Sequence, residues 1–400
     1  MNRFASVVVI GVVGTLASVG AFASLRVARA PSHEGAETTS EPPALAALGK
    51  RIFFDASLSE PAGTSCASCH DATRGYAGNH GSSIGVALGS APDHVAKRNT
   101  PSVLYLGLIH RFHFHWEEDA PLPDGVGGFF WDGRTDSLAD LTRQPLLNAD
   151  EMGNRDVTQL AHKITASAFA VDLRRAVGPI DGPESAVNAI GKAVEAFLLS
   201  EEMSPFTSKY DDVIRHRAAF TADEARGLAL FKNPAKGNCV SCHKMNDSIP
   251  DPARSPFSDF GFETVGVPRN ARLPANHDPK YFDLGLCEHA DARHQTSDAR
   301  FCGAFRTPSL RNVAVRTAFM HNGAFTRLRD VIAFYATRAT DPKRWYGATT
   351  YDDLPAKHRG NVNDLVAPYD RAEGGKPALD DAEIDAIVAF LGTLTDAAYR

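Results

Sequence analysis

Apolar residues recur every three to four positions in several segments of the chain, as they do along one face of an α-helix. The pattern predicts helices in the segments PPALAALGKRIFF, VTQLAHKITASAFAVDLRRAV, ESAVNAIGKAVEAFLLSEE, TADEARGLALFKN, LRDVIAFYATR and DDAEIDAIVAFLGTLTDAAYR. Strand-like alternation is scarce, and stretches rich in Gly and Pro at residues 250–275 and 349–376 predict long loops. We therefore expect a mainly α protein with little β structure.

The first 30 residues have the features of a secretory signal peptide. An apolar run over residues 4–22 precedes the small-residue triplet ARA at 28–30 and overlaps the triplet AFA at 21–23, and both triplets offer cleavage sites. A retained membrane anchor is the alternative, because the run approaches the length of a membrane span. The Gly, Ala and Ser content of the run favours cleavage, so we expect an exported protein with no membrane attachment afterwards.

Length and charge narrow the classes of protein further. The chain has 400 residues and a net charge of −6, and it lacks the basic stripe of a nucleic-acid-binding protein. The chain that remains after signal cleavage is longer than a typical single domain. We expect two domains, at residues 31–215 and 216–400, and no nucleic-acid partner.

Two pentapeptides carry the clearest chemistry, CASCH ending at His70 and CVSCH ending at His243. Cys-x-x-Cys-His attaches c-type haem, because both thiols bond the porphyrin and the histidine then lies under the iron as axial ligand. One motif alone is also compatible with chance or a redox dithiol, but two motifs in an exported chain favour two covalent haems in two cytochrome c-like domains. The attachment thiols are Cys66, Cys69, Cys239 and Cys242.

The remaining cysteines, Cys287 and Cys302, stand apart from these motifs. In an exported protein they predict a disulfide that closes the loop between them. Metal binding is the alternative, because His289 and His294 lie nearby in the sequence.

The order of several segments resembles the bacterial dihaem cytochrome c peroxidase superfamily, which includes the MauG-type enzymes. These segments are LGKRIFFDASLS, CASCH, RNTPSVL, FFWDGRTDSL, PLLNADEMGN, CVSCH, FRTPSLRNVAVRTAFMHNGAF and DAIVAFLGTLT. The resemblance covers nearly the whole mature chain. It implies a periplasmic enzyme that reacts with hydrogen peroxide.

The resemblance makes Val86 informative. Conventional members carry a distal histidine sixteen residues after the proximal one, and the count from His70 leads to Val86. Valine cannot ligate iron, so the resemblance implies a five-coordinate haem that is open to peroxide. His80 is the alternative ligand, although its offset differs from that of the family.

The second haem differs from the conventional pattern in a similar way. Conventional members supply a methionine fourteen residues after the histidine of an HDG-like motif, and the count from His321 leads to Tyr335, the residue type of MauG-type enzymes. A tyrosinate ligand favours ferric and higher iron states. Met320 is the rival ligand, and a buried aromatic on the helix is the other interpretation of Tyr335.

Glu151 matches the distal glutamate of the family. A carboxyl group in an apolar haem pocket has a raised pKa, and it is suited to move a proton of bound peroxide. A loop carboxylate that caps the next turn is the alternative. MauG-type enzymes have a glutamine where this chain has Leu141, so support for the pocket from Gln144 is an open alternative.

The resemblance also implies a region between the haems. Trp131 matches a tryptophan that lets the two haems share oxidising equivalents, in a bis-Fe(IV)-like state, and a large core anchor is the alternative. Asn99 matches a ligand of a calcium ion between the haems, with the backbone carbonyls of Arg316 and Ala318 at the other matching places.

A histidine-rich insertion, with His110, His113 and His115, precedes the tryptophan motif. Copper or zinc binding is one interpretation, and a solvated loop is the favoured one.

Three functions compete at this point. Insertions at residues 250–302 and after Tyr335 resemble the MbnH branch, which implies a metal-binding, MbnP-like partner on which a tryptophan is oxidised towards kynurenine. The first alternative is a conventional peroxidase that takes electrons from a small cytochrome or cupredoxin, and Val86 and Tyr335 argue against it. The second is a dihaem electron carrier or sensor, which leaves the open iron and Glu151 unexplained.

Overall fold

The structure, a computed structural model, describes residues 43–116, 123–245, 251–288 and 298–400. These residues belong to the compact unit Ser40–Arg400. The predicted signal peptide, His289 and His294 lie outside the described residues. Within the described ranges, no helix is both long enough and apolar enough to cross a membrane.

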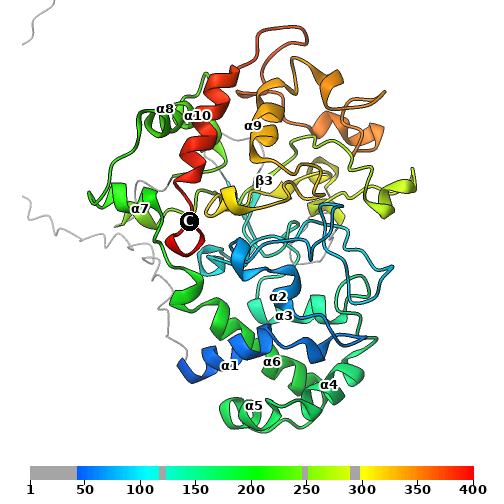
Figure 1. Cartoon of the computed structure of the whole chain (residues 1–400). Helices are drawn as coiled ribbons and strands as arrows, with labels where there is room; N and C mark the ends of the chain where they lie inside the picture. The colour runs from blue at the N-terminus through cyan, green and yellow to red at the C-terminus, as the bar shows by residue number, and fades with distance from the viewer. Residues whose placement is uncertain (1–42, 117–122, 246–250, 289–297) are drawn as a thin grey trace, which may run out of the picture. The chain divides into compact units, whose positions relative to one another are not determined.

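Helices make up most of the regular structure, as predicted (Figure 1). They are α1 (Pro43–Phe53), α2 (Cys66–Cys69), α3 (Leu138–Leu147), α4 (Val157–Ala166), α5 (Ala170–Val177), α6 (Pro183–Leu198), α7 (Lys209–Ile214), α8 (Ala222–Lys232), α9 (Leu328–Thr337) and α10 (Asp381–Gly392). The segment predicted as one helix over residues 157–177 is divided at Ser167, whose backbone N–H and side chain both bond the carbonyl of Ile164 and end α4.

Capping boxes fix the starts of two helices in the C-terminal half. Thr221 accepts a hydrogen bond from the backbone N–H of Glu224 at 3.3 Å, and the Glu224 carboxylate accepts one from the backbone N–H of Thr221 at 2.7 Å. Asp380 and Glu383 exchange the same pair of bonds at the start of α10. The predicted start of α8 is confirmed.

The described residues contain two sheets, and each is a short antiparallel pair of strands. β1 (His113–His115) pairs with β2 (Asp124–Val126), and β3 (Phe262–Glu263) pairs with β4 (Phe305–Arg306). The mainly α class with little β structure is thus confirmed. The histidine-rich insertion contributes strand β1 where a loop was expected, and Phe112 and Phe114 pack with Phe301 beside it. His110, His113 and His115 are exposed, as in the favoured interpretation.

The same helix crossing occurs once in each half of the chain. A Cβ atom on Gly49 of α1 would lie 1.8 Å from the carbonyl oxygen of Ala193 in α6, and one on Gly227 of α8 would lie 1.9 Å from that of Ala386 in α10. Only glycine permits so close a backbone approach. Each crossing belongs to a separate hydrophobic cluster, one within residues 48–206 and the other within residues 210–394. The domain boundary near residue 215 stays a prediction.

Candidate haem sites

The first Cys-x-x-Cys-His motif folds as α2, and the chain turns at His70. The backbone N–H of His70 donates to the carbonyl of Cys66 at 2.9 Å, and Nδ1 of its ring lies 3.2 Å from the carbonyl of Tyr76. Burial lowers the pKa of His70 to about 4, so its ring is neutral at pH 7. A neutral imidazole whose Nδ1–H faces a carbonyl keeps Nε2 available to a metal.

The second motif repeats this arrangement. The backbone N–H of His243 donates to the carbonyl of Cys239 at 2.8 Å, and Nδ1 lies 3.0 Å from the carbonyl of Phe257. Burial also lowers the pKa of His243 to about 4. Both motifs therefore present two thiols and an imidazole Nε2 from one short segment, which fits a covalent c-type haem at each.

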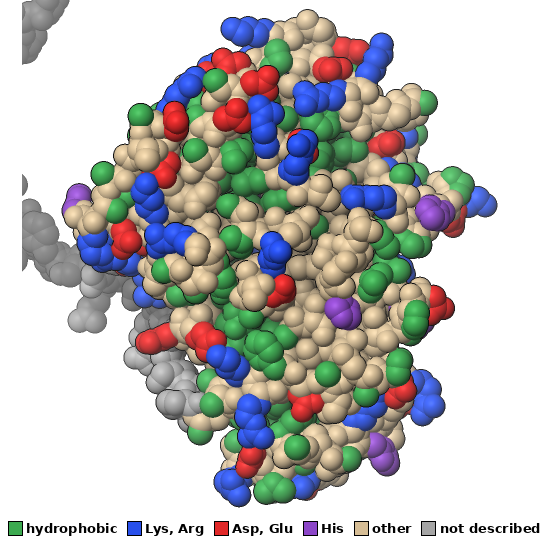
Figure 2. Space-filling model, in the orientation of Figure 1, with side chains coloured by type: hydrophobic (Ala, Val, Ile, Leu, Met, Phe, Trp, Pro, Cys, Tyr) green, Lys and Arg blue, Asp and Glu red, His purple; other side chains and the backbone are tan. Residues whose placement is uncertain are grey.

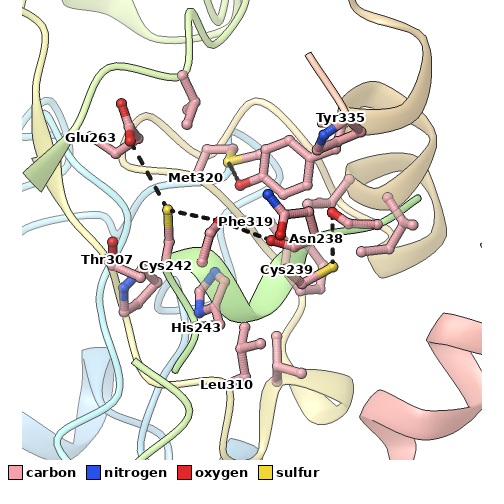
Figure 3. A pocket seen from close by; sticks show the side chains of 18 of the residues that line it. Asn238, Cys239, Cys242, His243, Glu263, Thr307, Leu310, Phe319, Met320 and Tyr335 are labelled. Carbon is pink, nitrogen blue, oxygen red and sulfur yellow. Dashed lines mark hydrogen bonds between the residues drawn. The ribbon is translucent and has the colours of Figure 1, made fainter. Parts of the chain in front are cut away.

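Both candidate sixth ligands of the second haem lie in one pocket with Cys239, Cys242 and His243 (Figure 3). Tyr335 enters from α9 and Met320 from the preceding loop, and the Tyr335 hydroxyl lies 3.8 Å from the Met320 sulfur. Burial raises the pKa of Tyr335. The ligand assignment to Tyr335 stays a prediction, because both side chains line the same space.

Two arginines, the buried Arg306 and the half-buried Arg316, line the same pocket and provide a test of the cofactor. Burial lowers the pKa of Arg306 and of Arg316 to about 10. Nη2 of Arg316 donates to the carbonyl of Thr100 at 3.2 Å, but its Nε has no hydrogen-bond partner among the described residues, and no carboxylate there shifts its pKa. Buried cations require anionic partners, and the propionate groups of haem are such anions. The donor set therefore fits haem.

Val86 and Glu151 both lie near Cys69 of the first motif. Val86 is fully buried in a small apolar cluster that packs against Cys69. Glu151 is close enough for its charge to contribute, after burial, to the raised pKa of the Cys69 thiol. Burial also raises the pKa of Glu151, whose Oε1 accepts a hydrogen bond from the Asn148 side chain at 2.8 Å.

His80 and Gln144, the alternative residues for the first haem site, make contacts elsewhere. Nδ1 of His80 lies 3.0 Å from the carbonyl of Leu88. Gln144 accepts a hydrogen bond from Nε of Arg134 at 2.7 Å, so its side-chain oxygen supports Arg134.

Trp131 is buried and connects the two halves of the chain. Its indole Nε1 donates to the backbone carbonyl of Asn99 at 2.7 Å, and its own carbonyl accepts from the backbone N–H of Arg306. Asn99 is buried as well, and its side-chain nitrogen donates to the carbonyl of Met320. Ala318, also buried, follows the Arg316 carbonyl by two residues.

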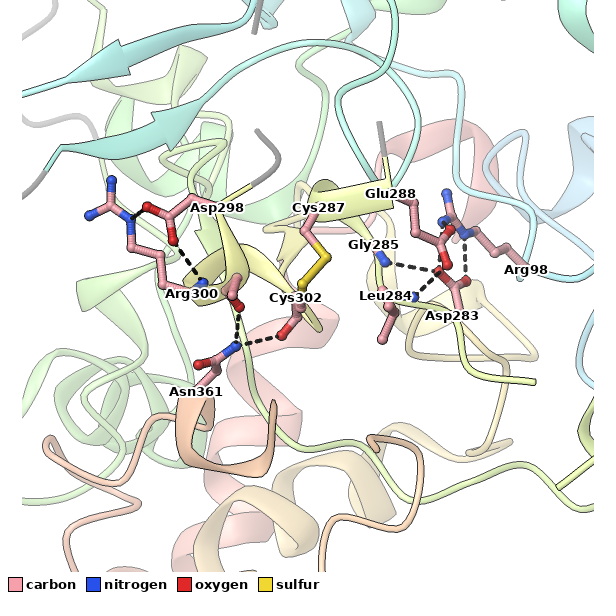
Figure 4. Close-up of a disulfide and its surroundings, with 11 residues drawn as sticks. Arg98, Asp283, Leu284, Gly285, Cys287, Glu288, Asp298, Arg300, Cys302 and Asn361 are labelled. Atoms are coloured by element: carbon pink, nitrogen blue, oxygen red, sulfur yellow. Dashed lines mark hydrogen bonds and ion pairs between the residues drawn. A yellow bond between two sulfur atoms is a disulfide. The ribbon is translucent and has the colours of Figure 1, made fainter. Parts of the chain in front are cut away.

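A charged network joins Asp132, which follows Trp131, to the segment before the disulfide, and Figure 4 shows the part of it in which Arg98 meets Asp283. Arg98 contacts Asp132 and, through Nε at 2.6 Å, Asp283. Asp283 lies four residues before Cys287, which forms a disulfide with Cys302 at an S–S distance of 2.04 Å. The disulfide therefore closes the loop that begins just after Asp283, and Glu288, the first residue inside this loop, lies 3.7 Å from Nη2 of Arg98.

The three insertion histidines line a surface groove with Asp124 that extends to Cys242. Over the described ranges, no three His, Cys, Asp or Glu side chains are grouped closely enough to hold a metal ion. On the face shown in Figure 2, acidic and basic side chains are interspersed.

Several functional candidates have no local sequence signal. Asn270, Arg272 and Gly323 surround the segment that carries Val86, and the half-buried side chain of Arg316 lines the pocket of the second haem motif. An arginine in an apolar segment without an acidic neighbour in sequence is only a weak indication of a functional site. The loop residues Asn270, Arg272 and Gly323 have no sequence feature that indicates one.

Comparisons with known proteins agree with this geometry. A family model described as di-haem cytochrome c peroxidase matches residues 43–219. The methylamine utilization protein MauG of Paracoccus denitrificans is 35% identical over 376 residues, which cover 89% of this chain and 90% of that protein. The cytochrome-c peroxidase IdrP2 of a Pseudomonas species is 30% identical, with 80% and 83% covered.

Solved structures show the same similarity. The diheme peroxidase BthA from Burkholderia thailandensis has a TM-score of 0.84 and 48% identity, and the match covers 90% of this chain and 87% of that one. A MauG-like protein associated with microbial copper homeostasis has a TM-score of 0.62 and 25% identity, with 89% and 90% covered.

Proposed function

Because the chain belongs to the di-haem cytochrome c peroxidase family, in its MauG-like group, we propose that it reacts with hydrogen peroxide at the haem over His70 and uses the oxidising equivalents on a residue of a partner protein. The chain is a peroxidase-type oxidoreductase with two c-type haems. The reacting haem, the target residue and the partner are the proposal.

The observation that carries this proposal is the position of Val86. Its side chain is fully buried in the cluster against Cys69, and a valine has no atom that ligates iron. His80, the alternative ligand on the same segment, is directed to the carbonyl of Leu88. We assign the distal side of the first haem as open to peroxide.

Glu151 is the proton carrier in this proposal. When bound, the haem iron supplies the redox chemistry that breaks the O–O bond. Burial raises the pKa of Glu151 above that of an exposed carboxyl group, which favours a group that can hold a proton and release it. Asn148 orients the carboxyl group by its bond to Oε1.

Trp131 is the candidate link between the two haems. The indole lines the pocket of the second haem, and its hydrogen bond to Asn99 ties it to the segment that follows the first haem site. Tyr335 is the proposed ligand of the second iron, which it would stabilise in high oxidation states. We propose that the two haems share the oxidising equivalents across this tryptophan.

The partner proposal is a periplasmic, metal-binding, MbnP-like protein on which a tryptophan is oxidised towards kynurenine. One solved relative is a MauG-like protein associated with microbial copper homeostasis, which supports a metal-binding partner. The leader-like residues 1–30 support export to the periplasm. The proposal also includes a calcium ion held by Asn99 and the backbone carbonyls of Arg316 and Ala318. Asn99 is buried and its side-chain nitrogen donates to the carbonyl of Met320, so its side-chain oxygen is the atom offered to the ion.

One experiment tests the reaction directly. Addition of one equivalent of hydrogen peroxide to the fully ferric protein, without reductant, should rapidly remove the ferric EPR signals of both haems. A protein that reacts only after one haem has been reduced would instead be a conventional peroxidase fed by a small cytochrome or cupredoxin. Peptide mass spectrometry of the partner after turnover then locates the oxidised residue.

A further inference from the structure

The segment that carries Val86 crosses the segment that follows His321 at backbone contact. A Cβ atom on Gly85 would lie 2.2 Å from the carbonyl oxygen of Gly323, and one on Gly323 would lie 2.1 Å from that of Gly85. Both glycines have positive φ angles, +97° and +66°, which side chains disfavour. No side chain fits at this crossing.

Asn270 joins the two segments from the C-terminal half. Its side-chain nitrogen donates to the carbonyl of Ile84 at 2.9 Å and to that of Asn322 at 2.8 Å. Asn270 is itself buried, with 3% of its surface exposed. Loss of this side chain would leave two carbonyls without their donor, which is costly for buried groups.

Arg272 joins the same two segments at their outer edge. Nη1 donates to the carbonyl of Ser83 at 3.1 Å, and Nη2 donates to that of Gly323 at 3.1 Å. Nε donates to the side-chain oxygen of Asn270 at 3.2 Å, so the guanidinium fixes Asn270 as well. The planar guanidinium supplies several donors in fixed directions, and a lysine would not reproduce this pattern.

The other end of the same segment is tied to the proposed proton carrier. The backbone N–H of Ser90 donates to the carbonyl of Glu151 at 2.7 Å. A Cβ atom on Gly89 would lie 2.6 Å from the carbonyl oxygen of Asp150, so these backbones are also in close contact. Residues 83–90 are therefore held at both ends.

We propose that Asn270 and Arg272, called the distal clamp here, are positioning residues that keep residues 83–86 in the open arrangement over the first haem. The inference rests on the proposed function, in which the iron over His70 is the peroxide site. His80 precedes the clamped residues by only three positions, and its Nδ1 bonds Leu88 within the same loop. Release of the clamp frees this loop and lets His80 approach the iron.

Two variants test the clamp, Asn270→Ala and Arg272→Met, together with Arg272→Lys, which keeps the charge but not the geometry. We expect amide hydrogen exchange of residues 80–90 to accelerate about tenfold, the scale of one lost hydrogen bond. Low-spin ferric signal should appear at the expense of high-spin signal. Addition of His80→Ala to Arg272→Met should restore the high-spin signal. Arg155→Met, at a largely exposed arginine, is the matched control and should change neither readout.

The two readouts separate the clamp from the proposed function. Folded clamp variants with unchanged exchange at residues 80–90 would overturn the clamp. Faster exchange without a low-spin signal would show that the clamp holds the loop but does not keep His80 from the iron, which overturns the proposal in its stated form. A parent protein whose haems are both low-spin would overturn the open iron instead, while exchange would still report on the clamp.

Discussion

The indole Nε1 of Trp131 donates a hydrogen bond to the backbone carbonyl of Asn99, with 2.7 Å between the nitrogen and the oxygen. The backbone N–H of Asn99 in turn donates to the carbonyl of His321. One chain of two hydrogen bonds therefore runs from the tryptophan through the N-terminal half to the segment beside the second haem. The indole N–H of Trp131 is therefore directed at a backbone segment that is itself bonded to the loop of His321.

Trp131→Phe should keep a large buried ring but remove the indole and its hydrogen bond. We expect the first haem to react with peroxide at a similar rate, while the loss of ferric signal at the second haem slows by at least about tenfold. Rapid-freeze-quench EPR measures both. Trp345→Phe is the matched control. The indole Nε1 of Trp345 donates a comparable hydrogen bond to the Thr337 hydroxyl, with 2.9 Å between the two atoms. Equal behaviour of both variants would contradict the role of Trp131.

Glu151→Gln should slow the reaction with peroxide by about 10²–10⁴-fold, the usual contribution of a positioned acid–base group. Both haems should remain attached, because Glu151 makes no part of either Cys-x-x-Cys-His motif. Stopped-flow absorbance gives the rate. Asp150→Asn removes a neighbouring carboxylate that pairs with Lys97 at the surface and should react like the parent. An unchanged rate in Glu151→Gln would remove the assigned role.

Tyr335→Phe should raise the reduction potential of the second haem, because the loss of a hard anionic ligand disfavours the ferric state. Met320→Leu should leave that potential nearly unchanged. Redox titration followed by absorbance checks both variants. The reverse outcome, with the large change in Met320→Leu, would identify methionine as the ligand.

Asp283→Asn should lower the free energy of unfolding at pH 7 by about 3–5 kcal/mol, as expected for one broken buried pair. Burial opposes the charged form of Asp283, but the charge and hydrogen bonds of Arg98 outweigh it and hold its pKa below the ordinary value. This pair therefore stabilises the fold above the unfolded pKa, near 4, and its contribution is lost as pH falls through the lower folded pKa.

Denaturant unfolding of the parent and Asp283→Asn at pH 7 and at pH 3 checks this dependence, and the difference should shrink at the lower pH. Asp298→Asn, which removes a more exposed partner of Arg300, should cost less than about 1 kcal/mol at either pH. A constant difference across this range would contradict the assignment.

Chelation of calcium should change the coupling between the haems without releasing either one. We expect metal analysis to find one calcium per chain in the parent and none in Asn99→Ala. Treatment with a calcium chelator should slow charge sharing after peroxide addition, and added calcium should restore it in the parent. A parent protein without bound calcium would exclude the site.

The sequence predicted those parts of the fold that depend on local pattern. Helices with a sustained apolar period were found as expected, and so were the two haem motifs, because their chemistry lies within five residues. α3 was missed because its sequence, LADLTRQPLL, contains a proline inside the helix, a residue that usually ends one. The hairpin of the histidine-rich insertion was missed because its strands contain only three residues each.

The distal clamp was beyond sequence reasoning for a different reason. Asn270 and Ile84 are 186 residues apart in the chain, and the clamp bonds go to backbone carbonyls, which carry no sequence signature. The contact between Gly85 and Gly323 is equally hidden, because a glycine in a loop has many causes. Such long-range contacts follow only from the tertiary fold.

The backbone crossing of Gly85 and Gly323 has a consequence for redesign of the enzyme. An engineer who wished to convert it into a reductively switched peroxidase would begin with Val86→His. The new imidazole would sit beside a crossing that admits no side chain and on a segment clamped to the opposite half. This imidazole would ligate the iron but could not move away from it when the protein is reduced. A reductive switch therefore requires a more mobile loop in addition to the new ligand.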